Sequence, residues 1–460
     1  MKMKPCAGVC RTGQLAFLIT ALTLVVLPFN LWAAFPAQFG PVTNFYAGGV
    51  YSGLNAIATG DFNGDGITDV AVANNSRVDL LLGRVGGAFS TSSTNIIYNG
   101  GNFLTAGDFN NDGKLDLLVV NDYGGAVLLG DGSGHFPAKT NCYANYPRGL
   151  AVGDFNGDGK LDLAITSSLG LTVAFGRGNG SFATPTTTNY SGFAGGRTAG
   201  FMSAGNLRGN GPVDLVVAMP HGGTDSFCVM QNNGDGTFAA PAFYVTTNVS
   251  DHYALTVSDF NSDGKPDVAV LNYINQSVSI WMNKGDGTFS LATNISVPGV
   301  SPASVASADF NGDGNMDLFV RGGSAARVLT GNGDGTFTVG ALMNVPADSG
   351  ASPYFYETVA VGDFTGRGMP DLALVNSPDT SVAIMLNQTP PILTLAPMAN
   401  YCQITWLKTF GAGCALEYTT NISTPGNWQT FPYPPVVLGN QKAVTDWTDA
   451  AQKFYRLKKQ

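Results

Sequence analysis

A nine-residue segment recurs seven times along this chain and constrains its fold more than any other feature. Five copies are nearly identical and begin at Asp61 (DFNGDGITD), Asp108 (DFNNDGKLD), Asp154 (DFNGDGKLD), Asp259 (DFNSDGKPD) and Asp309 (DFNGDGNMD). Two weaker copies begin at Asn206 (NLRGNGPVD) and Asp363 (DFTGRGMPD), so successive copies start 47, 46, 52, 53, 50 and 54 residues apart. This period is typical of propellers and repeat arrays. We name the copies acidic loops one to seven and number their residues as positions 1 to 9.

Each repeat unit carries the pattern of four short strands. In the fifth unit, apolar runs at Ala254–Ser258 and Asp267–Leu271 flank the acidic loop, and a third run covers Ser277–Met282. A glycine turn, Asn283–Phe289 (NKGDGTF), then leads to a more polar fourth run. The 60 glycines and the low charged fraction of 12% suit many short strands joined by tight turns. The sequence therefore predicts an all-β fold with one four-stranded propeller blade per unit.

The two ends of the repeat series are complementary. The seventh unit stops after Ser381–Asn387 and lacks both a glycine turn and a fourth strand, whereas Phe39–Tyr46 precedes the first unit and resembles a fourth strand such as Phe238–Tyr244. We predict that this N-terminal strand completes the last blade and closes a seven-bladed β-propeller over residues 35–388. Closure would remove the exposed sheet edges of an open array.

The side chains of the five full loops match the ligands that calcium prefers. Positions 1, 3, 5 and 9 bear oxygen atoms and position 6 is a glycine that permits a sharp turn, so each loop can surround a Ca²⁺ ion. Asx-turns between strands would favour the same residue types, but three converging carboxylates would repel each other without a cation. The predicted ligands are Asp61, Asn63, Asp65 and Asp69; Asp108, Asn110, Asp112 and Asp116; Asp154, Asn156, Asp158 and Asp162; Asp259, Asn261, Asp263 and Asp267; and Asp309, Asn311, Asp313 and Asp317.

Acidic loops four and seven depart from this pattern. Loop four has Arg208 and Asn210 at positions 3 and 5, and loop seven has Thr365 and Arg367 there. We predict that neither loop binds calcium, and that a guanidinium group near Asp214, or near Asp363 and Asp371, supplies a fixed positive charge instead.

The five DFNxDG loops, the apolar-Gly-Asp-Phe strands that enter them and the Gly-Asp-Gly-Thr-Phe turns resemble the FG-GAP or VCBS repeat family, which includes the propellers of integrin α chains. The resemblance covers about residues 35–388. It implies a propeller fold and bound calcium, and it implies that ligands bind the face opposite the calcium loops. It implies no single function, because the repeat occurs in adhesins, lectin-like proteins and lyases.

The two ends of the chain carry different signals. Residues 1–34 combine Lys2, Lys4 and Arg11 with an apolar run at Leu15–Leu27 and small residues at Ala33–Ala34, which predicts a cleaved secretory signal peptide. The alternative, a membrane anchor, needs a longer apolar run of about 20 residues. Residues 389–460 lack the repeat and predict a small β-sandwich that resembles fibronectin-type-III-like accessory modules. Cys402 and Cys414 could pair there or remain free thiols.

Charge and localisation narrow the choice of partner. Losing three basic residues with the signal peptide would take the net charge from −9 to −12, which argues against nucleic acid. We expect a secreted, periplasmic or cell-surface protein without a transmembrane segment after signal cleavage.

Aromatic residues gather in the loops on the face opposite the acidic loops, together with charged residues such as Arg321. We hypothesise that Tyr146, Tyr253, Tyr273 and Tyr354 line a shared shallow site for a glycan or an extracellular protein, although single aromatics often only cap blade cores. The alternative is a secreted lyase or glycosidase. The sequence gives it little support, because Glu357 is the single glutamate of residues 35–388 and most aspartates belong to the acidic loops.

Overall fold

The computed structural model describes residues 19–20, 37–46, 54–74, 77–91, 96–97, 101–168, 170–190, 200–209, 211–219, 225–245, 254–347, 359–376, 381–389, 394–397, 401–407, 414–419, 429–438, 441–447 and 452–459. These residues contain strands and turns and no helix. No described segment forms an apolar helix long enough to cross a membrane. The chain divides into two compact units, of which the larger comprises Ala34–Gly366 and Pro370–Gln388.

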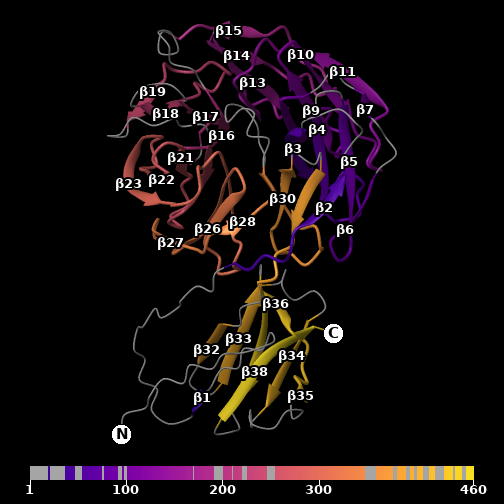
Figure 1. Ribbon diagram of the computed structural model, residues 1–460, viewed down its shortest axis with the longest axis vertical. Coiled ribbons are helices and arrows are strands. Elements are labelled where there is room, and N and C mark those ends of the chain that lie inside the picture. Colours follow the sequence, from indigo (N-terminus) through magenta and orange to yellow (C-terminus); the bar gives the residue numbers. More distant parts are fainter. Residues whose placement is uncertain are drawn as a thin grey trace. The chain divides into compact units, whose positions relative to one another are not determined.

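The described residues of the larger unit form seven antiparallel sheets, which follow the repeat units in order (Figure 1). Sheet 1 contains β3 (Leu54–Gly60), β4 (Asp69–Asn74), β5 (Arg77–Arg84), β6 (Ala88–Thr91) and β7 (Ile96–Ile97). Sheet 2 contains β8 (Phe103–Gly107), β9 (Asp116–Asn121), β10 (Gly124–Leu129) and β11 (Ala138–Cys142). Sheet 3 contains β12 (Gly149–Gly153), β13 (Asp162–Ser167), β14 (Gly170–Ala174) and β15 (Thr186–Thr188).

The remaining four sheets repeat this arrangement. Sheet 4 contains β16 (Met202–Gly205), β17 (Asp214–Ala218), β18 (Asp225–Met230) and β19 (Ala242–Val245). Sheet 5 contains β20 (Leu255–Ser258), β21 (Asp267–Asn272), β22 (Ser277–Asn283) and β23 (Phe289–Ser296). Sheet 6 contains β24 (Ser304–Ala308), β25 (Asp317–Gly322), β26 (Ala325–Gly331), β27 (Phe337–Val339) and β28 (Met343–Asn344). Sheet 7 contains β29 (Val359–Gly362), β30 (Asp371–Asn376), β31 (Ser381–Met385) and β2 (Thr43–Tyr46).

The hydrophobic core lies between neighbouring sheets. The second strand of each sheet is buried along its whole length, as in β4 and β21, because another sheet covers each of its faces. Seven buried clusters each join two neighbouring sheets, and one of them joins Val70 and Leu81 of sheet 1 to Phe364 and Ile384 of sheet 7. The sheets therefore close into a ring around their first strands, and the first strands of all these sheets except sheet 3 line a cavity of about 350 Å³. This confirms the predicted β-propeller.

The predicted N-terminal strand completes sheet 7. β2 pairs with β31 in antiparallel register, with Thr43 opposite Ile384 and Tyr46 opposite Ser381. Phe39 forms a bridge with Asn387, as Phe238 does with Asn232 in sheet 4. The N-terminal segment thus takes the place of the glycine turn and the fourth strand that the seventh unit lacks.

The smaller unit comprises Met1–Ala33, Arg367–Met369 and Thr389–Gln460. One of its sheets contains β32 (Thr394–Pro397), β33 (Tyr401–Leu407), β37 (Gln441–Trp447) and β36 (Val436–Leu438). The other contains β1 (Ile19–Thr20), β38 (Gln452–Lys459), β34 (Cys414–Thr419) and β35 (Gln429–Thr430). Trp406, Leu416 and Tyr455 belong to a buried cluster to which both sheets contribute. Its likeness to fibronectin type III modules stays a prediction.

Candidate metal centres

The five full acidic loops share one hydrogen-bonded conformation. In loop one, the carboxylate of Asp61 accepts main-chain N–H bonds from Gly64, Asp65 and Gly66 at 2.7 to 3.1 Å. Asn63 Oδ1 accepts from the Asp65 N–H at 2.9 Å, and Asp65 Oδ1 accepts from the Ile67 N–H at 2.8 Å. Equivalent bonds hold loops two, three, five and six. The main chain therefore curls around the oxygens of positions 1, 3 and 5.

The aspartate at position 9 has a structural role that the sequence interpretation missed. This aspartate begins the second strand of every sheet and is fully buried in all seven: Asp69, Asp116, Asp162, Asp214, Asp267, Asp317 and Asp371. In sheet 1, Asp69 accepts hydrogen bonds from the N–H of Phe62 at 2.9 Å and from the N–H of Gly83, at the end of the third strand, at 2.7 Å. The same pair of bonds recurs in sheets 2, 3, 5, 6 and 7. This carboxylate ties the acidic loop to the third strand. One sequence signal pointed to it, because position 9 is aspartate even in loops four and seven.

The carboxylates of one loop influence each other. Burial raises the pKa of Asp69 and Asp267 to about 6 and that of Asp317 to about 7. Main-chain hydrogen bonds oppose this rise, whereas the negative charges at positions 5 and 1 of the same loop add to it. The pKa values of Asp116 and Asp162 are raised for the same reasons. Three carboxylates therefore lie close enough to repel each other electrostatically.

The donor set fits a hard cation such as calcium. Each full loop offers carboxylate and amide oxygens on a tight main-chain curl, and it offers no sulfur or imidazole ligand. Among the residues that the structure describes, no group of three or more His, Cys, Asp or Glu side chains has the arrangement of a metal site. In the conformation described, these carboxylate oxygens accept main-chain hydrogen bonds.

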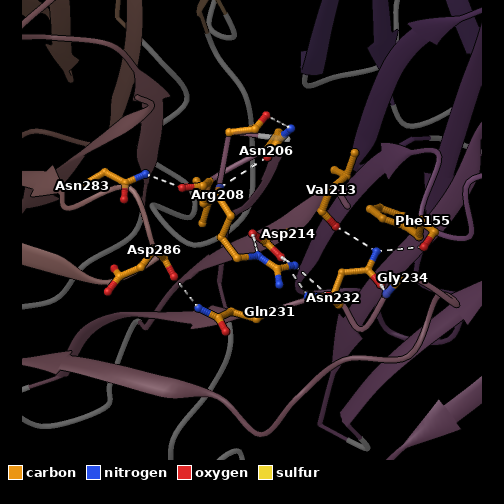
Figure 2. Close-up of polar contacts among 12 residues, drawn as sticks. Phe155, Asn206, Arg208, Val213, Asp214, Gln231, Asn232, Gly234, Asn283 and Asp286 are labelled. Atoms are coloured by element: carbon orange, nitrogen blue, oxygen red, sulfur yellow. Dashed lines mark hydrogen bonds and ion pairs between the residues drawn. The ribbon is translucent and has the colours of Figure 1, made fainter. Parts of the chain in front are cut away.

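Acidic loop four is built around an arginine (Figure 2). Arg208 pairs in bidentate fashion with the buried Asp214, with Nη2 2.6 Å from Oδ1 and Nε 3.1 Å from Oδ2. Nη2 also donates to the carbonyl of Asn232 at 2.7 Å. The prediction that a guanidinium lies near Asp214 is confirmed. The Asn232 N–H also donates to Asp214 Oδ1 at 2.8 Å, so sheet 4 keeps the main-chain bond between position 9 and the end of the third strand. Arg208 adds a second link between them and supplies a positive charge.

Acidic loop seven keeps the position 9 bonds, because Asp371 accepts from the N–H groups of Phe364 and Asn387. Position 3 differs, since the hydroxyl of Thr365 donates to Asp363 Oδ1 at 3.2 Å. The main chain of Asp363 meets sheet 1, where the Thr68 N–H donates to its carbonyl at 3.3 Å and the Thr68 hydroxyl accepts from its N–H at 3.2 Å.

Position 2 joins each loop to the next sheet. Six of these carbonyls accept a hydrogen bond from the next sheet: those of Phe62, Phe109 and Phe260 from a glycine N–H, and those of Phe155, Leu207 and Phe310 from an asparagine side chain. Figure 2 shows two of these asparagines, Asn232 and Asn283. Six position 2 phenylalanines also pack edge-on against a phenylalanine of the next sheet, with ring centroids 5.5 to 6.1 Å apart. In sheet 7 that partner is the N-terminal Phe39, which packs on Phe310. The acidic loops thus hold the ring together.

Two of the four predicted ligand-binding tyrosines are among the described residues, and they belong to different sheets. Tyr146 lies between β11 and β12 and is 53% exposed, and Tyr273 lies between β21 and β22. Tyr253 and Tyr354 are outside the described residues. The prediction that Arg321 belongs to an exposed face is wrong, because its side chain is fully buried and donates to the carbonyls of Pro346 and Val375. Arg321 thereby links sheets 6 and 7.

Comparison with known proteins agrees with this architecture. No curated protein sequence matches the chain significantly. An Agrocybe aegerita lectin, solved to explain recognition of non-reducing terminal N-acetylglucosamine, is 20% identical with a TM-score of 0.50, over 75% of this chain and 85% of that chain. A chain from the complex of BBS1N with ARL6DN is 12% identical with a TM-score of 0.51, over 76% of this chain and 96% of that chain. At these identities, both likenesses show the fold alone.

The model of the FG-GAP-like repeat matches six overlapping segments, at residues 61–119, 108–165, 154–217, 206–270, 259–320 and 309–374. Each match runs from one acidic loop into the second strand of the following sheet. Because together they span more than half of the chain without a break, the protein belongs to the FG-GAP-like repeat family.

Proposed function

We propose that this protein is an exported, calcium-stabilised propeller that acts as an extracellular binding module for a glycan or a protein. The observation that carries the proposal is a difference between the two sets of loops. The five full acidic loops keep one length and one hydrogen-bond pattern, whereas the connections between second and third strands vary in length, from Asp122–Tyr123 between β9 and β10 to Tyr273–Gln276 between β21 and β22. A rigid scaffold that presents variable loops is the usual arrangement of a binding protein.

Calcium would act on the scaffold. An ion in loops one, two, three, five and six would neutralise converging carboxylates at the places where neighbouring sheets meet. Ion binding to the folded state would therefore stabilise the ring. The oxygen-only donor set of these loops supports calcium rather than a transition metal.

Two further points favour binding over catalysis and over an intracellular role. The structurally similar Agrocybe aegerita lectin recognises a terminal sugar, and a glycan is one of the ligand classes proposed here. The basic and apolar pattern of residues 1–34 supports export, which would place the propeller among extracellular glycans and proteins.

An array of glycans and extracellular proteins tests this proposal. The chain without residues 1–34 is applied in calcium, and bound spots are then read for newly released reducing ends. We expect retention on a defined ligand class without release of new ends, and weaker retention after chelation. Release of new reducing ends would contradict this proposal and support the alternative, a secreted lyase or glycosidase. Equal retention in calcium and in chelator would contradict the proposed role of calcium.

A further inference from the structure

One corner of sheet 2 exposes two large aromatic side chains that touch each other. Tyr123 lies at the tip of the β9–β10 hairpin and is 83% exposed, and Tyr146 lies in the connection from β11 to β12 and is 53% exposed. Their ring centroids are 5.7 Å apart at an interplanar angle of 69°. The two rings therefore form an open corner, in which most of the Tyr123 side chain faces solvent.

The main chain at this corner is held in an unfavourable conformation. Tyr146 has a φ of 47°, a region that bulky residues avoid, and it is the only aromatic residue with positive φ among those described. Its N–H donates to the carbonyl of Asp122 at 2.9 Å, which ties the two loops together. Strain of this kind persists where surrounding structure enforces it, and it concentrates at binding sites.

Polar groups lie beside the rings. Asn102 Nδ2 donates to Asp122 Oδ1 at 3.0 Å, and Asn121 Oδ1 accepts from the N–H groups of Tyr123 and Gly124 and so stiffens the hairpin. Oxygen atoms of Asp122 and Asn102 keep the capacity to accept hydrogen bonds from hydroxyl groups. The equivalent hairpin of sheet 6, Gly322–Ser324, has neither an aromatic ring nor a carboxylate.

We propose that Tyr123, Tyr146, Asp122 and Asn102 form a carbohydrate-binding subsite that takes a single pyranose ring. This inference rests on the proposed binding function and specifies its ligand class and location. The apolar C–H face of the sugar stacks on Tyr123, and Tyr146 bounds one side of the subsite. The Asp122 carboxylate accepts hydrogen bonds from hydroxyl groups of the sugar. An aromatic plane combined with a fixed carboxylate and amide suits a polyhydroxylated ring better than an apolar peptide side chain.

The test uses the chain without residues 1–34 in calcium and a panel of methyl pyranosides, with saturation-transfer NMR to detect binding and titration to measure affinity. Tyr123→Ala is expected to weaken the best binder at least about fivefold, whereas Tyr123→Phe keeps the stacking plane and most of the affinity. Tyr46→Ala is the matched control, because Tyr46 is also a strongly exposed tyrosine of this unit and lies on β2. It should leave the affinity unchanged.

A second variant separates binding from structural support. Tyr146→Gly suits the positive φ, so it should keep or raise the melting temperature while weakening sugar binding. A lower melting temperature with unchanged affinity would make Tyr146 a structural residue and overturn the subsite. Sugar binding that survives Tyr123→Ala would overturn the subsite but leave the binding module intact. Binding of an extracellular protein with no pyranoside bound would likewise refute the subsite alone, and the absence of any ligand would refute both proposals.

Discussion

Replacing Arg208 by alanine tests whether its guanidinium supplies, in acidic loop four, the positive charge that we propose calcium supplies in the full loops. Asp214 is fully buried, and the variant would leave its carboxylate with the Asn232 N–H at 2.8 Å as the remaining bond recorded for it. Removing one partner of a buried ion pair costs about 3 to 5 kcal/mol. The Arg208 side chain is 28% exposed, so we expect the lower end, about 3 kcal/mol. For a domain of this size, that corresponds to a fall in melting temperature of about 4 °C.

The assay is thermal unfolding with calcium and with chelator. Lys160→Ala is the control, because Lys160 forms an ion pair with Asp158 in loop three in which both side chains are 35% exposed. Its loss should cost no more than about 1 kcal/mol. The triple variant Asn206→Asp, Arg208→Asn and Asn210→Asp restores the full loop pattern. It should bind one more calcium ion per chain and recover stability in calcium only. A melting temperature within one degree of the parent for Arg208→Ala, or a triple variant that gains no calcium, would refute the reasoning.

Three further results are expected. Chelation should lower the melting temperature of the parent protein, and metal analysis should find about five calcium ions per chain; equal melts or ions in loops four and seven would contradict this. Since folding raises the pKa of Asp69 and Asp267 to about 6, above the usual value near 4, the chelated protein should lose stability as the pH rises from about 4 through 7, and calcium should stabilise it more at pH 8 than at pH 5. A chelated protein that melts higher at pH 8 would be evidence against this assignment. Phe39→Ala should cost about 2 kcal/mol in chemical unfolding, because the ring packs on Phe310 and Phe319; a change below about 0.5 kcal/mol would mean that the N-terminal segment does not secure sheet 7.

The repeat made much of the fold predictable. The spacing of the acidic loops located the sheets, and the incomplete seventh unit identified Phe39–Tyr46 as the missing strand. These predictions depend on local patterns of apolar residues and turns, which a sequence displays directly. The position of Arg208 beside Asp214 was predictable for the same reason, since both belong to one loop.

Interactions between sheets were not predictable in this way. Arg321 follows an apolar strand and precedes a glycine turn, which suggested an exposed loop, yet its side chain is buried and Nη2 donates to carbonyls from β30 and from the segment after β28. The pairing of Tyr146 with Tyr123 depends on how two loops of sheet 2 approach each other. Such contacts arise from tertiary packing, and the residue types on either side do not specify them.

The pairing of β2 with β31 has a consequence for biosynthesis. The ribosome makes residues 43–46 first and residues 381–385 almost last, so sheet 7 stays incomplete while the rest of the propeller is translated. At typical bacterial or eukaryotic rates the delay is roughly 20 to 70 s. During that time Phe39 and the edge of β2 have no partner, although the first six sheets can already assemble. Slow release of the last repeat unit from the ribosome would prolong the exposure of β2. A chain truncated before residue 381 would never bury this strand.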